Sequence, residues 1–315
     1  MIKDILQRVS ADRIRHDLFY LCRDPLPFRK VNYTRPGQSM NSLAEADAFI
    51  RGQIEAAGYA VTTTTYRVQP FRCDRTKPLH HWYSTPAPSD PSFDATNLEA
   101  TRRGCERPEE IIQLIAHKDS MSWIDSPGAH DNAVGTVANL ELARVLATCD
   151  LRRSVRLLFC NEEHTPWTSR FAAEAAAARG DHIVAVLNVD SLDGKSEEDM
   201  AAGKMTHVVG YSTDEGRALA EFVAAGAARH KIGLDVRVIF KQHVNDDDGM
   251  FINAGFRTTV MNLGSWPYAD SEYHLPGDVP ERVNIANVVR STQLLLAAIL
   301  DIDANDTDNL WKRMS

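Results

Sequence analysis

Residues that can bind metal ions or move protons stand where short apolar runs of this sequence end. Three runs lead into such residues: 111–116 into His117, 155–160 through Asn161 into Glu162 and Glu163, and 183–189 into Asp190. Two further candidates, Asp131 and His274, lie in polar loops. Imidazole nitrogens combined with carboxylate oxygens suit zinc, with Co2+ or Mn2+ as substitutes. The pattern therefore predicts a metal centre.

Each candidate also has an ordinary structural explanation when it is considered alone. A histidine after a strand is more often a hydrogen-bonded structural residue, a Glu-Glu pair is usually a solvated loop, and Asp131 can cap the following helix. As a set they are harder to dismiss, because three carboxylates gathered at one edge of a sheet repel one another and are disfavoured without cations. Five ligands exceed the needs of one tetrahedral ion and fit two ions that share a carboxylate.

The elements that must position these residues follow from hydrophobic periodicity. Nearly continuous apolar runs are typical of strands buried on both faces, and helical periods lie between them. The predicted strands are 61–68, 111–116, 155–160, 183–189, 207–209, 236–240 and 258–261. The predicted helices are 42–57, 132–147, 165–180, 214–230 and 285–300, and 72–94 is expected to be a surface loop.

Two of these helices carry specific end signals. Ser42 with Glu45 resembles a capping box, and Gly58 is a stop signal. Pro166 is expected in the first turn of the helix that ends at Gly180. Together the elements predict an α/β fold with a mixed, mainly parallel central sheet, helices on both faces and no separate lid domain. Ligands bind at the carboxyl ends of the strands in such sheets.

Composition narrows the functional class. The chain has 315 residues, 43% hydrophobic and 25% charged, which is typical of an ordinary globular protein. We expect a single catalytic domain over 1–315, with a helical N-terminal lead-in at 1–40 and a tail at 304–315. The net charge of −8 argues against nucleic-acid partners. Five cysteines without CxxC spacing indicate free thiols. Short apolar runs and the absence of a signal segment predict no membrane partner and a cytoplasmic location.

Several motifs in a fixed order resemble the co-catalytic zinc aminopeptidases of the bacterial leucyl aminopeptidase and aminopeptidase Y type, to which glutaminyl cyclases are related. The resemblance covers about residues 40 to 300. It rests on AHKDS at 116–120, PGAHDNAVG at 127–135, LFCNEE at 158–163, LNVD at 187–190, DDGMF at 247–251 and YHLPGD at 273–278. TNL at 96–98 resembles the usual entry to the first metal strand. The resemblance implies a zinc exopeptidase fold of the phosphorylase/hydrolase-like kind.

The resemblance also implies a role for each candidate residue. Asp131 would bridge two zinc ions, with His117 and Asp190 completing one site and Glu163 and His274 the other. Glu162 would be the general base, and Asp119 would orient His117 through its second ring nitrogen. Asp247 would be an acidic residue behind the ligands, although Asp248 replaces the histidine that usually follows.

These roles imply hydrolysis of a peptide or a small amide, most simply by an aminopeptidase in which a water bridged by two metals is the nucleophile. Glu162 would take the proton from that water. A glutaminyl-cyclase-like acyltransferase, which uses one zinc, and a non-catalytic binding protein on the same fold are the alternatives. A carboxypeptidase or deacylase usually carries a lid, and no room for one is seen between Asp190 and His274.

Some positions depart from the pattern and leave the substrate open. The Glu-Glu pair is followed by HTPWTS instead of a glycine-rich run. His130 and His164 are extra imidazoles, and we expect surface histidines or, as the alternative, substrate contacts. Trp123, Trp167 and Trp266 are candidates for a side-chain pocket or for simple packing. The sequence leaves open the oligomeric state, the metal occupancy and the side-chain preference.

Overall fold

The computed structural model describes residues 2–306, which form a nine-stranded sheet between two layers of helices. The sheet order is β10-β9-β11-β8-β5-β6-β4-β1-β7. The strands are β1 (Val61–Pro70), β4 (Phe93–Arg102), β5 (Arg107–His117), β6 (Arg153–Cys160), β7 (His164–Thr165), β8 (His182–Val189), β9 (Thr206–Tyr211), β10 (Asp235–Phe240) and β11 (Thr259–Leu263). A separate pair, β2 (Arg72–Cys73) and β3 (Tyr83–Ser84), lies outside it.

The centre of the sheet is parallel, and its register brings the carboxyl ends of three strands together. β5 pairs in parallel with both β6 and β8, and β8 pairs in parallel with β11. Ile115 lies opposite Leu158 on one side and Asn188 on the other. Antiparallel pairing joins β4 to β6, β1 to β4 and β11 to β9, so the sheet is mixed. The predicted fold class is confirmed.

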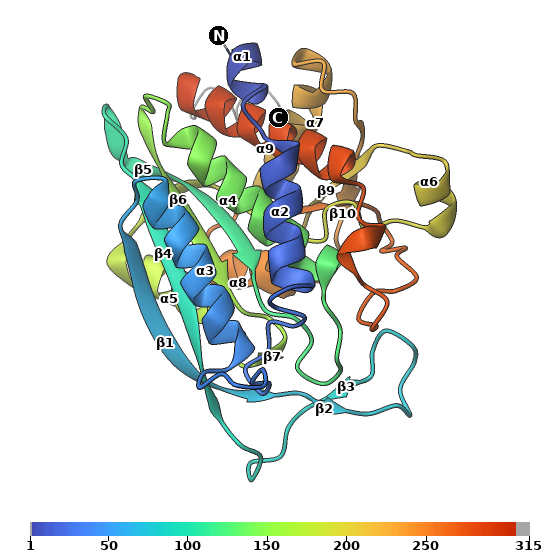
Figure 1. The fold of residues 1–315 in the computed structure, drawn as a ribbon. Coiled ribbons are helices and arrows are strands. Elements are labelled where there is room, and N and C mark those ends of the chain that lie inside the picture. Colours follow the sequence, from blue (N-terminus) through green and yellow to red (C-terminus); the bar gives the residue numbers. More distant parts are fainter. Residues whose placement is uncertain (1, 307–315) are drawn as a thin grey trace.

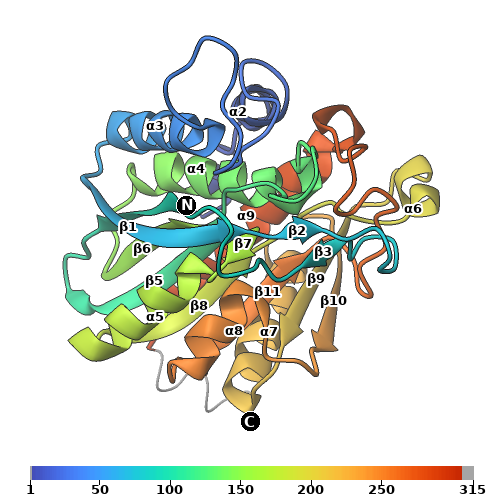
Figure 2. The ribbon, with the colours of Figure 1, turned by 90° about the horizontal axis from the view of Figure 1, so that it is seen from below.

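Helices cover both faces of the sheet, with α2, α3, α4 and α9 in front of it and α5 and α8 behind it (Figure 1). Figure 2 shows the same layers from below. The helices are α1 (Ile2–Leu6), α2 (Ala11–Cys22), α3 (Ser42–Ala56), α4 (Val134–Leu146), α5 (Thr168–Arg179), α6 (Glu197–Ala201), α7 (Asp214–Arg229), α8 (Asp246–Asn253) and α9 (Ile285–Ala304). The larger apolar core joins α4, α7 and α9 to one face of the sheet, and a smaller core seats α5 and α8 on the other.

Three local predictions were wrong. The segment 72–94 holds β2, β3 and the start of β4, a strand that the sequence analysis missed because its apolar residues alternate with polar ones. Helix α3 is capped by Asn41, whose side chain accepts a hydrogen bond from the Ala44 amide, while the Ser42 hydroxyl bonds to Lys30. Helix α5 begins at Thr168, because the two residues before Pro166 form β7 instead.

Helix α9 is, by length and composition, long and apolar enough to cross a membrane, although the apolar runs in it are short. Its apolar window is 67% buried inside the fold, as expected for the core helix of a globular protein. The N-terminal lead-in is helical in α1 and α2, followed by an irregular stretch up to Asn41. The predicted tail starts at the end of α9, and its residues 307–315 lie outside the described residues.

Candidate metal centre

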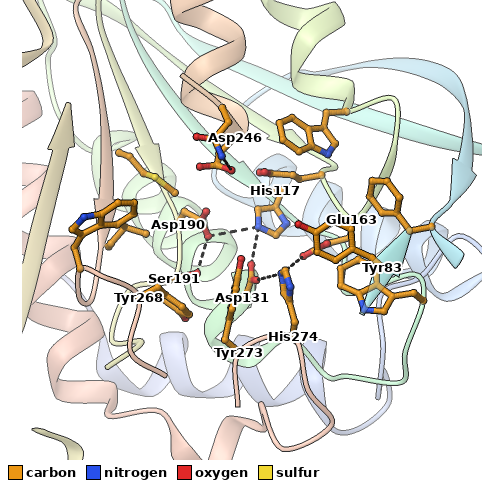
Figure 3. Close-up of a pocket in the computed structure, with 18 residues that line it drawn as sticks. Tyr83, His117, Asp131, Glu163, Asp190, Ser191, Asp246, Tyr268, Tyr273 and His274 are labelled. Carbon is orange, nitrogen blue, oxygen red and sulfur yellow. Dashed lines mark hydrogen bonds and ion pairs between the residues drawn. The ribbon is translucent and has the colours of Figure 1, made fainter. Parts of the chain in front are cut away.

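The five predicted ligands converge at the carboxyl edge of the sheet (Figure 3). The Nε2 atom of His117 lies 3.0 Å from Oδ1 of Asp131 and 3.6 Å from Oδ1 of Asp190. The Nε2 atom of His274 lies 3.1 Å from Oδ2 of Asp131 and 3.7 Å from Oε1 of Glu163. Asp131 therefore presents one oxygen to each of two half-sites, each completed by one histidine and one further carboxylate.

The turn that carries Asp131 requires a glycine at its start. Gly128 has φ +60°, and a Cβ atom there would lie 2.4 Å from the Asp131 carbonyl oxygen. The backbone amides of His130 and Asp131 donate to the two oxygens of Asp278, at 2.8 and 3.1 Å. Asp278 follows His274 in the same loop, so one carboxylate ties the bridging residue to the loop of the second histidine.

His274 is oriented by a residue that the sequence analysis missed. The Nδ1 atom of His274 donates to the backbone carbonyl of His80 at 2.7 Å, because a carbonyl can only accept. This contact leaves Nε2 unprotonated when the ring is neutral, and Nε2 faces Asp131 and Glu163. Tyr273 stacks on the ring, with centroids 3.8 Å apart. His80 lies in the expected surface loop, where a backbone contact leaves no signal in the sequence.

Asp119 holds the glutamate pair more closely than it holds His117. Its two oxygens accept hydrogen bonds from the backbone amides of Glu162 and Glu163, at 2.9 and 2.8 Å. The distance from its Oδ1 to Nδ1 of His117 is 3.4 Å, longer than a typical hydrogen bond. The predicted link to His117 is thus loose, and Asp119 mainly fixes the loop that follows β6.

Crowding of carboxylates dominates the electrostatics of the site. Burial raises the pKa of Glu162 well above its usual range, as do the nearby charges of Asp247 and Asp246. Burial and Asp131 raise the pKa of Glu163 in the same direction. Burial alone would lower the pKa of His117, but hydrogen bonds with its carboxylate neighbours raise it well above the ordinary value. The site therefore stabilises positive charge strongly.

The donor set is of the kind that holds zinc. Ligand atoms of His117, Asp131 and Glu163 lie within 4.8 Å of one another, and so do those of His117, Glu162 and Asp190. Each half-site offers nitrogen and oxygen ligands of the kind that zinc accepts. Glu162 borders the site with an oxygen that is buried and has no hydrogen-bond partner.

A pocket of about 800 Å³, open to solvent, leads to these residues. Polar and apolar surface contribute about equally to its walls, and the aromatic lining residues include all three tryptophans that the sequence analysis singled out. The lining residues besides the ligands and Glu162 are Phe71, Tyr83, Trp123, Trp167, Ser191, Asn245, Asp246, Met261, Leu263, Trp266, Tyr268 and Tyr273. None of the lining residues is a lysine or an arginine.

The predictions for the two extra histidines were wrong. His130 and His164 are 0% and 1% exposed, and neither lines the pocket. The Nδ1 atom of His130 lies 2.9 Å from Asp278 and 3.1 Å from Asp270, so buried acids hold this ring inside the fold. His164 lies in β7 with Nε2 3.6 Å from Asp119, and burial lowers its pKa.

Two consecutive acids in α8 flank the site from the other side. Asp247 is buried and accepts a hydrogen bond from the Cys160 thiol at 3.1 Å, and burial raises its pKa to about 6. Asp247 thus lies behind the ligands, as the motif implies. Asp248, which replaces the usual histidine, pairs with Nζ of the buried Lys241 at 2.8 Å.

Known proteins share this sequence pattern and fold. A probable aminopeptidase of Saccharomyces cerevisiae, YDR415C, is 26% identical over 212 residues, covering 63% of this chain and 55% of that protein. A probable zinc metalloprotease of Leptosphaeria maculans is 27% identical over 197 residues, covering 54% and 44%. The chain thus spans about half the length of these relatives.

Solved structures agree on the fold. The LapA aminopeptidase of Legionella pneumophila superposes with a TM-score of 0.72 at 16% identity, covering 97% of this chain and 74% of that chain. A glutaminyl cyclase of Porphyromonas gingivalis superposes with a TM-score of 0.69 at 15% identity, covering 93% and 99%. The sequence pattern of Peptidase family M28 matches residues 97–299, which include all five predicted ligands. The chain therefore belongs to peptidase family M28.

Proposed function

We propose that the chain is an aminopeptidase that uses two zinc ions, with Glu162 as its general base. The observation that carries the proposal is the division of the Asp131 carboxylate between two half-sites. His117 and Asp190 would hold one ion, and His274 and Glu163 the other. When bound, such a pair lowers the pKa of a water molecule and polarises the scissile carbonyl.

The residues of the chain divide the remaining work. Glu162 has a buried, unpartnered oxygen beside the ligands, which suits it to take the proton of a water and to deliver it to the leaving amine. Asp119 fixes the backbone of both glutamates, so that neighbouring side chains serve different tasks. The aromatic side chains of the wall would hold the side chain of the substrate.

Charge in the pocket favours the amino end of a peptide. A carboxypeptidase or a deacylase of N-acyl amino acids must hold a free carboxylate, for which arginine or lysine is the usual partner. The pocket lining contains neither, whereas Asp246 and Glu162 add carboxylates beyond the ligands. A substrate that brings an ammonium group complements this surface, and one that brings a carboxylate does not.

The proposal is tested with the full chain, stripped of metal and titrated with Zn2+, Co2+ or Mn2+. We expect about two zinc ions per chain, turnover of aminoacyl-anilides and no turnover of their N-acetylated forms. Cyclisation of an N-terminal glutamine with one zinc per chain would instead support the cyclase alternative. Two-metal binding with no turnover of any of these substrates would refute the proposed activity.

The adjacent glutamates provide matched variants with the same chemical change. Glu162→Gln should keep both zinc ions and lower kcat by roughly 10²- to 10⁴-fold, the usual worth of a general base. Glu163→Gln should lose one zinc ion, because it removes a ligand. Metal analysis and kinetics of both proteins separate the two roles. A fully active Glu162→Gln protein would refute the base assignment.

A further inference from the structure

A buried arginine in the N-terminal lead-in contacts the loops that carry two of the ligands. Arg29 is 0% exposed and lies outside the matched family span of 97–299. Its described side-chain hydrogen bonds go to carbonyl oxygens and one thiol, and none goes to a carboxylate. They are Nε to Lys118 O (2.7 Å), Nη1 to Pro127 O (2.6 Å), Leu21 O (2.8 Å) and Cys22 Sγ (3.2 Å), and Nη2 to Gly128 O (2.8 Å).

These contacts lie next to both of the residues His117 and Asp131 in one half-site. Lys118 directly follows His117, and Gly128 starts the turn that carries Asp131, so one guanidinium holds both stretches of backbone. The backbone of Arg29 adds to this connection, because its amide donates to the Ser120 hydroxyl at 3.0 Å and its carbonyl accepts from the Ser120 amide at 2.9 Å.

A guanidinium is the group that suits this position. Its donors point in fixed, divergent directions within a plane, whereas a lysine ammonium is a compact group on a flexible stem. Contacts with Leu21 and Cys22 also place the positive charge at the carboxyl end of α2, where the helix dipole favours it. Arg29 therefore links α2, the loop after β5 and the Asp131 turn through one rigid group.

We propose that Arg29 is a positioning residue for the metal centre, which sets the separation of His117 and Asp131 through the backbone of the segments that carry them. This inference rests on the proposed metal site. The Nε2 atom of His117 and the Oδ1 atom of Asp131 lie 3.0 Å apart. A residue of the N-terminal lead-in that fixes the segments carrying these two atoms would therefore take part in metal binding. Residues that orient metal ligands typically change metal affinity or activity by about 10- to 100-fold when they are replaced.

The chain contains a matched control in Arg153, which is also 0% exposed. Its Nη1 donates to the carbonyls of Ile302 and Asp303 at 2.8 and 2.9 Å, and its Nε donates to Glu110 at 2.5 Å. Arg153 begins β6, whose eight residues place it roughly 23 Å from the strand end that leads to Glu163. The two arginines thus share burial and carbonyl partners but differ in their distance from the ligands.

The experiment compares Arg29→Lys with Arg153→Lys in the full chain, stripped of metal. Zinc affinity is measured by competition with a chromophoric chelator, and thermal unfolding is followed by circular dichroism. We expect both variants to unfold at lower temperature, while Arg29→Lys alone weakens zinc binding by about 10- to 100-fold. Ser120→Ala, which removes only one contact to Arg29, should weaken zinc binding by a smaller factor, and it serves if Arg29→Lys does not fold.

The outcomes separate this inference from the proposed function. If the unaltered chain binds no zinc, the proposed function fails. If it binds zinc and both Arg29→Lys and Ser120→Ala keep its affinity, the positioning role is wrong. Equal loss of affinity in Arg29→Lys and Arg153→Lys would also overturn it, because the effect would then reflect general destabilisation.

Discussion

The two ends of the central strands handle buried charge in opposite ways. At the amino ends, largely buried carboxylates have arginine partners: Glu110 pairs with Arg153 at 2.5 Å, and Asp181 pairs with Arg156 at 2.6 Å. At the carboxyl ends, the carboxylates of the predicted ligands face one another and two histidines, and among the described residues no lysine or arginine lines the pocket. The amino ends balance charge within the chain, whereas the carboxyl ends are arranged to bind cations from solution.

This difference has a thermodynamic consequence. The charge of a buried carboxylate that is bonded to an arginine is compensated within the folded chain. A cluster of carboxylates without such partners is costly until a cation compensates its charge. We therefore expect the stability of the carboxyl end to depend on metal and that of the amino end to be independent of it. The predictions below test that contrast.

The largest effect should come from Asp131→Asn. An amide oxygen is neutral and its nitrogen cannot accept, so the shared ligand of both half-sites is lost. We expect loss of both zinc ions and a fall of kcat/KM by about 10³-fold or more, since the pair supplies both nucleophile activation and carbonyl polarisation. Metal analysis and aminoacyl-anilide kinetics measure these losses. A variant that binds two ions and keeps its activity would break the assignment of Asp131.

Removing metal from the unaltered chain should have a large effect on stability. A ligand present at 1,000 times its Kd stabilises the folded state by about 4 kcal/mol, so chelation should lower the unfolding temperature by several degrees. Amide hydrogen exchange should speed up in the loops after β5, β6 and β8 but not at the amino ends of these strands. Asp131→Asn is the control, because a chelator should not change its unfolding temperature. Uniform acceleration across both ends would contradict the proposed contrast.

The sequence predicts which side chains converge at the carboxyl edge but not the contacts that support them, for a physical reason. His117, Glu163 and Asp190 follow apolar runs that are recognisable in the sequence as buried strands. Because these strands are parallel, the residues that follow them lie at the same edge of the sheet. The supports His80 and Arg29 act through backbone carbonyls, which every residue possesses. Their contacts join positions 194 and 89 residues apart and carry no residue-type signal. The predictions for His130 and His164 were wrong for the same reason. The acids that surround His130, Asp270 and Asp278, are distant from it in the sequence, so no nearby residue indicates the contact.

His207 is a buried histidine with neutral partners, unlike the histidines of the metal centre, which face carboxylates. His207 lies between Ser291 and Asn262, and burial lowers its pKa to about 4. The folded state therefore prefers the neutral ring, so this contribution to stability is complete above the ordinary pKa of about 6.5 and is lost as the pH falls toward 4. A pKa that is lower by one in the folded state corresponds to roughly 1.4 kcal/mol, which predicts a loss of a few kcal/mol over that range.

His207→Gln should flatten the dependence of the unfolding free energy on pH between 6.5 and 4. Urea unfolding at several pH values measures it, with the exposed His243→Gln as a control that should leave the slope unchanged. An identical slope in His207→Gln and the unaltered chain would show that this ring does not contribute to acid sensitivity.

The smallest effect concerns Asp246, a carboxylate of the pocket that is paired with a lysine of the chain. Lys241 lies 2.9 Å from Asp246 and 2.8 Å from Asp248, so one ammonium is shared by two acids, of which only Asp246 lines the pocket. The Nζ atom of this lysine is also 3.4 Å from the sulfur of Met261, which offers an apolar surface in the same pocket as the Asp246 carboxylate. A lysyl or arginyl side chain could lie along that surface and end at the carboxylate.

Asp246→Asn should therefore lower kcat/KM for lysyl- relative to leucyl-anilide by about two- to fivefold, the worth of a partly exposed ion pair. Asp248→Asn is the matched control, because it changes the other partner of Lys241 without altering a pocket residue. An unchanged ratio in Asp246→Asn would mean that Lys241 already neutralises the Asp246 carboxylate. Equal changes in the two variants would instead trace the effect to Lys241, and the charge balance of the carboxyl end would then include a cation supplied by the chain itself.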